Sequence, residues 1–111
     1  MAQTLQHQII AGALALIANE ANWTRGSLAR TRDGTRCGWC DPDAARYCAL
    51  GALGRAAAEL TADYQQSHFF AMKAAKEVLS ANNLAGYCLP SVNDVRGHAA
   101  IVALFKKALG S

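Results

Sequence analysis

Apolar residues recur every three or four positions in four separate stretches of this 111-residue sequence. That spacing puts them on one face of an α-helix, and each helix must then bury its apolar face against a neighbour. We expect helices at about residues 4–21, 42–61, 66–81 and 97–109. A chain of this length has room for one hydrophobic core. The pattern therefore predicts a mainly α fold, a compact bundle of about four helices forming a single domain over residues 1–111.

Small side chains should set how closely these helices pack. The chain is 52% apolar but only 7% aromatic, which favours short contacts between helices over large aromatic layers. The second predicted helix is thinnest, because Gly51 and Gly54 lie inside it and each costs about 1 kcal/mol of helix propensity. We expect another helix to approach its backbone there. Asp41 and Pro42 resemble the cap and first residue of this helix.

A different pattern follows the first helix, where Asp33 and Gly34 favour a two-residue turn. We expect a small β-hairpin or an ordered loop, resting on the helices because an isolated hairpin is marginally stable. Alternation along a strand would put Arg30, Arg32 and Arg36 on one face. Guanidinium groups bind phosphates and carboxylates. The predicted ligand-binding residues are Arg25, Arg30, Arg32, Arg36 and Trp39.

The partner expected for this surface is a protein or an anionic, nucleotide-like small molecule. Nucleic acid is possible but not favoured, since the formal net charge is only +3 and Trp23 and Trp39 are the only nearby aromatic residues for base stacking. The apolar run at residues 9–18 is too short to span a bilayer. We therefore expect a cytoplasmic protein with no membrane partner. Self-association into a homo-oligomer remains open.

Three cysteines raise the question of a metal. Cys37 and Cys40 have the spacing of a zinc-binding pair, and Cys48 is a candidate third ligand. A structural zinc site needs four ligands, and the sequence has no second pair of this kind. We therefore favour no metal and no other cofactor, with zinc as the alternative.

Cys48 also has a catalytic interpretation. Together with His98 and either Asn93 or Asp94, it supplies the nucleophile, base and orienting group of a cysteine-dependent hydrolase or transferase. Buried free cysteines are common, however. Asn93 and Asp94 are also typical of a turn that bonds neighbouring backbone N–H groups, with Asp94 pairing to a basic residue of the hairpin. The sequence favours a non-enzymatic interaction module, with this enzyme as the alternative.

The order of several short motifs resembles a small uncharacterised bacterial and phage family, a domain of unknown function. The motifs are a tryptophan after the first helix (Trp23), Asp33-Gly34, Cys-x-x-Gly-Ala-Leu (Cys48 to Leu53), Asn93-Asp94 and His-Ala-x-x-Val-Ala-Leu (His98 to Leu104). The resemblance covers nearly the whole chain and implies a shared fold. It also implies an accessory or counter-defence protein of a phage or mobile element that works by binding.

Overall fold

The computed structural model describes residues 4–110 and is mainly helical, as predicted. The elements in chain order are α1 (Leu5–Ile17), a short 3-10 helix η1 (Glu20–Asn22), β1 (Ala29–Thr31), β2 (Arg36–Cys37), β3 (Ala44–Tyr47), α2 (Ala49–Thr61), α3 (Ser67–Ala81), α4 (Leu89–Arg96) and α5 (His98–Ala108). Within the described residues there are thus five α-helices rather than about four. The predicted hairpin is part of a three-stranded antiparallel sheet in the order β2-β1-β3.

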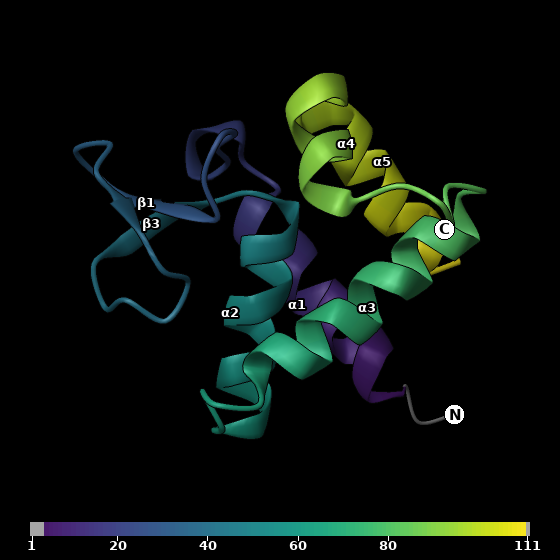
Figure 1. The fold of residues 1–111 in the computed structure, drawn as a ribbon, viewed down its shortest axis with the longest axis horizontal. Helices are drawn as coiled ribbons and strands as arrows, with labels where there is room; N and C mark the ends of the chain where they lie inside the picture. Colours follow the sequence, from purple (N-terminus) through teal and green to yellow (C-terminus); the bar gives the residue numbers. More distant parts are fainter. Residues whose placement is uncertain (1–3, 111) are drawn as a thin grey trace.

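The helices bury one core, and the sheet lies at one end of the molecule (Figure 1). In Figure 1, α2 runs beside α1 and α3, while α4 and α5 lie together at the side away from the sheet. The largest side chains with no exposure come from α1, α2, α3 and α5: Ile9, Ile10, Ile17, Leu53, Val78, Ile101 and Phe105. Close packing of small residues is confirmed between α1 and α2, where a Cβ on Gly12 would lie 3.2 Å from that of Ala56.

The N-terminal helix is shorter than the apolar pattern predicts. It begins after Thr4, whose hydroxyl accepts a hydrogen bond from the His7 N–H at 3.1 Å. It ends at Ile17 rather than near residue 21, because Asn19 caps the separate helix η1 by accepting from the Ala21 N–H. None of the described helices has both the length and the apolar composition needed to cross a bilayer.

The predicted first turns of the second helix are instead a strand and a turn. Asp41 accepts a hydrogen bond from the Asp43 N–H at 2.8 Å in a turn, and β3 then pairs with β1. Sheet pairing and the burial of Tyr47 outweigh the helix propensity of the two alanines in β3. The helix begins only after Cys48, whose Sγ accepts from the Gly51 N–H at 3.3 Å. Cys48 is therefore the cap of α2 and does not lie two turns inside it.

At Gly51 and Gly54, groups other than the expected helix pack against the backbone of α2. A Cβ on Gly51 would lie 1.8 Å from the carbonyl oxygen of Leu28, just before β1. A Cβ on Gly54 would lie 2.3 Å from the indole ring of Trp39. The two glycines therefore let the segment before β1 and a tryptophan pack against the helix backbone. The prediction that another helix approaches α2 at Gly51 and Gly54 is therefore wrong.

Two further helices differ from the sequence pattern. In α3, Phe69 and Met72 share the apolar spacing but are 55% and 41% exposed, and the buried face is formed by small residues with Val78 and Leu79. Residues 84–97 lie between the predicted helices and contain Pro90, yet α4 forms there. Proline is tolerated in the first turn of a helix, where its missing N–H has no partner to lose.

Candidate functional site

The register of the sheet gathers arginines on one face. In β1, Ala29 is opposite Cys37 and Tyr47, and Arg30 is opposite Arg36 and Arg46. Directly opposite residues of antiparallel strands point to the same face. Ala29 and Tyr47 are buried, so this side packs against the rest of the protein. The other side carries Arg36, Arg30 and Arg46 next to one another, and we call these three residues the arginine row.

Arg30, at the centre of the row, is held in place by uncharged oxygens. Its Nε donates to the hydroxyl of Thr24 at 3.1 Å, its Nη1 to the carbonyl of Gly34 at 3.0 Å and its Nη2 to the carbonyl of Arg25 at 3.4 Å. These bonds orient the guanidinium without neutralising its charge. Arg36 and Arg46 flank it and are exposed.

Within residues 4–110, no carboxylate forms an ion pair with the arginine row, since the ion pairs there are His7–Glu77 and Arg55–Glu59. The nearest acid in sequence, Asp33, is bound within its own turn. Its carboxylate accepts hydrogen bonds from the Thr31 hydroxyl and the Thr35 N–H, and these bonds lower the pKa of Asp33. The row is therefore a set of like charges without an internal counter-charge.

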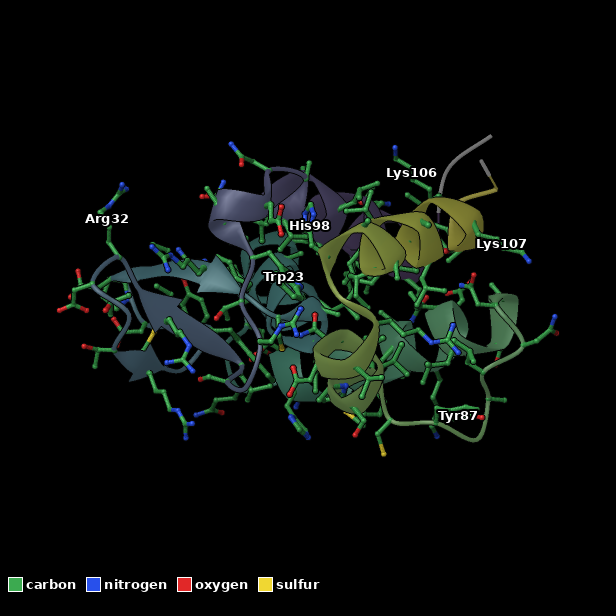
Figure 2. All side chains as sticks on the ribbon, turned by 90° about the horizontal axis from the view of Figure 1, so that it is seen from above. Trp23, Arg32, Tyr87, His98, Lys106 and Lys107 are labelled. Atoms are coloured by element: carbon green, nitrogen blue, oxygen red, sulfur yellow. The ribbon has the colours of Figure 1, made fainter. Side chains whose placement is uncertain are left out.

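Two further predicted ligand-binding arginines lie outside this row. The guanidinium of Arg25 lies 5.0 Å from the centre of the Trp23 ring, in a cation–π contact. Arg32 lies just beyond β1 and extends from the end of the molecule (Figure 2). Sequence reasoning missed Arg46, because residues 44–47 were assigned to a helix. The charged Arg46 next to the aromatic Tyr47, shortly after Pro42, was the available signal in the sequence.

Trp39, predicted as a ligand-binding residue, belongs to the core instead. Its side chain is 9% exposed, its Nε1 donates to the Ser67 hydroxyl at 3.1 Å, and its ring stacks on His68. The ring also packs against the backbone of Gly54. These contacts give Trp39 a structural role, and the binding role predicted for it stays a prediction.

Asn93 connects three parts of the chain from a fully buried position. Its Oδ1 accepts from the Trp23 indole N–H at 2.7 Å and from the Ala49 N–H at 2.9 Å, and its Nδ2 donates to the Thr24 carbonyl at 3.1 Å. We call this set of bonds the Asn93 junction. It joins α4 to the start of α2 and to the segment after η1, so Asn93 bonds distant backbone groups rather than the neighbouring ones expected from sequence.

Asp94 completes the junction. Its Oδ1 accepts from the Asn93 side-chain amide at 3.0 Å and from the Gly26 N–H at 3.1 Å. It therefore does pair with the segment leading into the sheet, although through a backbone N–H and not through the predicted basic side chain. Both residues lie within α4 rather than in a turn.

The alternative catalytic set is not assembled. Cys48 is 2% exposed, and its burial raises the pKa of its thiol. His98 places its Nε2 2.6 Å from the Ile17 carbonyl, an oxygen that can only accept, so this nitrogen carries a proton. No hydrogen bond joins Cys48 to His98 in the described part of the chain. The arrangement of a thiol next to a base is therefore not formed.

A metal centre is not assembled either. No three His, Cys, Asp or Glu side chains within residues 4–110 gather closely enough to hold a metal ion. The alternative zinc ligands Cys37, Cys40 and Cys48 are all free cysteines, of which Cys40 is exposed and Cys48 buried.

Comparison with known proteins supports the resemblance seen in the sequence. No curated protein and no solved structure matches the chain significantly. A family described as a family of unknown function, DUF6197, matches residues 1–110. The agreement extends over nearly the whole sequence, and the chain therefore belongs to this family.

Proposed function

We propose that this protein is a non-enzymatic interaction module that captures an anionic partner on its arginine row. The observation that carries the proposal is the register of the sheet, which sets Arg36 and Arg46 on either side of Arg30 with no carboxylate paired to any of them. Arg25 and Arg32, the other predicted ligand-binding arginines, are exposed and lie outside this row.

Energetics support a functional reason for this arrangement. Like charges directly opposite each other across strands reduce stability, so a partner that supplies negative charge removes an unfavourable interaction when it binds. Neighbouring strands lie about 4.8 Å apart, and the row therefore spans about 10 Å. That length suits a group with several negative charges, such as a chain of phosphates or a run of carboxylates on a protein.

The fixed position of Arg30 also favours binding. Ordering a long side chain on binding costs about 0.5–1.5 kcal/mol, and Arg30 is already oriented by three hydrogen bonds. The exposed side chains of Arg36 and Arg46 can then change conformation to contact the partner. A cytoplasmic accessory or counter-defence protein of a phage or mobile element, acting by capture rather than turnover, is consistent with such a surface.

Charge reversal provides the test. We expect Arg36→Glu with Arg46→Glu to weaken binding of adenosine triphosphate, or of a poly-glutamate peptide, at least tenfold, measured by calorimetry at two salt concentrations. The matched control is Lys106→Glu with Lys107→Glu, which changes the net charge equally at the distant end of α5 (Figure 2).

The control should bind within about twofold of the unchanged protein, and both double variants should keep its melting temperature within a few degrees. Equal weakening in the two variants would mean that overall charge rather than the arginine row binds the anion. Undiminished binding by the Arg36 and Arg46 variant would remove the proposal.

A further inference from the structure

A hollow of about 330 Å³ lies between α3 and the segment that leads into α4. Its floor is apolar and buried, formed by Leu50 of α2, Ala75 and Leu79 of α3, and Leu89 of α4. Helices α2, α3 and α4 and the connection between α3 and α4 thus contribute to the lining. The volume lies at the lower end of the range for small-molecule sites.

The rim of the hollow is exposed and contains a single charged side chain. Met72 is 41% exposed and Tyr87 is 60% exposed, and Cys88 is exposed beside them. Lys76 is the one charged lining residue of this hollow. Its sequence neighbour Glu77 pairs instead with His7 at 3.1 Å, and no carboxylate in the described chain forms an ion pair with Lys76.

We propose that this hollow binds a small amphiphilic anion, an unbranched hydrocarbon chain of about ten carbons that ends in a carboxylate. The hydrocarbon chain lies over Leu50, Leu79 and Leu89, and the carboxylate faces the ammonium group of Lys76. The apolar floor selects a hydrocarbon body, and the unpaired lysine sets the sign of the head group. Met72 is an unbranched, adaptable side chain that can follow the shape of such a ligand.

This site is separate from the arginine row. Figure 2 shows Tyr87, on the rim of the hollow, at the opposite end of the molecule from Arg32. The two proposals therefore succeed or fail independently. A polyanion without an apolar part would gain nothing from the hollow, and a fatty carboxylate would leave most of the row unpaired.

Thiol reactivity measures occupancy without altering the protein. We expect decanoate, at concentrations too low for micelles, to slow the alkylation of Cys88 by iodoacetamide at least fivefold, measured by mass spectrometry of peptides. Cys40 is also exposed and does not line this hollow, so its alkylation rate is an internal control and should not change. Octanoate should bind about fifteenfold more weakly, since each buried methylene contributes about fourfold.

Substitutions of two lysines in α3 distinguish the contribution of the charge to ligand binding from that of the apolar floor. We expect Lys76→Gln to weaken decanoate at least fivefold and to leave binding of decanol unchanged. Lys73→Gln is the matched control, because Lys73 lies on the same helix, contacts the Phe69 ring and does not line the hollow. Ala85→Trp, at the exposed rim, should fill the opening and abolish protection of Cys88 by decanoate.

Three results would overturn the proposal. The first is no protection of Cys88 by millimolar decanoate. The second is equal protection by decyltrimethylammonium, which would show that Lys76 does not select an anion. The third is protection of Cys88 that rises with protein concentration in the absence of ligand, which would show that a second copy of the chain occupies the hollow.

Discussion

The Asn93 junction and the arginine row are neighbours connected through residues 24–26, yet their polar side chains differ in burial and in the number of partners. In the junction, the side-chain amide of Asn93 is buried and makes four hydrogen bonds. In the row, Arg36 and Arg46 are exposed cations with no ion pair in residues 4–110. A buried polar group without partners would destabilise the fold, while an exposed one is available to a partner. The contrast separates a structural site from a candidate binding site.

The largest effect should come from removing the junction. Asn93→Ala deletes four hydrogen bonds and leaves the Trp23 and Ala49 N–H groups without their acceptor. At about 1 kcal/mol for each bond, with a further cost for buried unpaired groups, we expect a loss of about 4 kcal/mol in the free energy of unfolding. Urea denaturation followed by circular dichroism measures it.

Asp94→Ala is the comparison variant, because Asp94 is only half-buried and accepts two bonds. It should cost about 1–2 kcal/mol. A similar loss for both variants would show that burial of Asn93 does not set the energy of the junction.

The contact between α2 and Trp39, in the loop after β2, can be broken at Gly54, where a Cβ would lie 2.3 Å from the Trp39 ring. Gly54→Ala must displace the ring from Ser67 and should cost about 2–3 kcal/mol, despite the better helix propensity of alanine. Gly38→Ala is the control, because no heavy atom lies within 4 Å of its added Cβ. Tryptophan fluorescence should shift in the first variant and not in the second. An unshifted spectrum for Gly54→Ala would mean that the ring does not depend on this glycine.

The buried cap of α2 should make stability depend on pH. Burial raises the pKa of the Cys48 thiol, so the folded protein holds this proton more tightly than the unfolded chain does. The resulting stabilisation is full below the pKa of the unfolded thiol and is lost as pH rises through the folded value. Cys48→Ser keeps an acceptor for the Gly51 N–H and removes the titration.

Urea midpoints at pH 8 and pH 10 provide the measurement. The unchanged protein should lose more stability between these two values than Cys48→Ser loses. Equal losses would show that groups other than Cys48 cause the alkaline dependence.

The smallest effect, and the one opposite in sign, is expected in the arginine row. Arg36→Glu places a carboxylate directly opposite Arg30 and should raise the free energy of unfolding by about 0.5 kcal/mol. Thermal denaturation at low and high salt measures it, and the gain should shrink at high salt. A clear loss of stability would show that Arg36 has a structural role, and the contrast with the junction would then disappear.

The apolar periodicity was sufficient to predict helices in the regions of α1, α3 and α5 and a mainly helical fold. The start of α2 could not be predicted in the same way, because Asp41 and Pro42 resemble a helix start and alanines are strong helix formers. What makes residues 44–47 a strand is pairing with β1, a contact between distant residues that local propensity does not contain. Apolar spacing also does not identify the inner face of α3, since small alanines that allow close packing are buried there and Phe69 is not.

The candidate site was predictable where it depends on side chains that alternate between the two faces of a single strand. The Asp-Gly turn was enough to bring Arg30 and Arg36 to one face, whereas Arg46 required knowledge of β3. The structural contacts of Trp39 could not be predicted, because its partners Gly54 and Ser67 come from two helices distant in the sequence. Asn93 was singled out for its chemistry, but its partners lie 44–70 positions away.

Those separations bear on how the chain acquires its structure during synthesis. The indole N–H of Trp23 and the first N–H of α2 both donate to Oδ1 of Asn93. During synthesis these two hydrogen bonds can form only after Asn93 has emerged from the ribosome. The helices before α4 can form earlier, but the hydrogen bonds of the Asn93 junction form only once α4 has been synthesised. A nascent chain stalled before residue 93 should therefore remain open to proteases around residues 23–26, and a chain released after α5 should resist them.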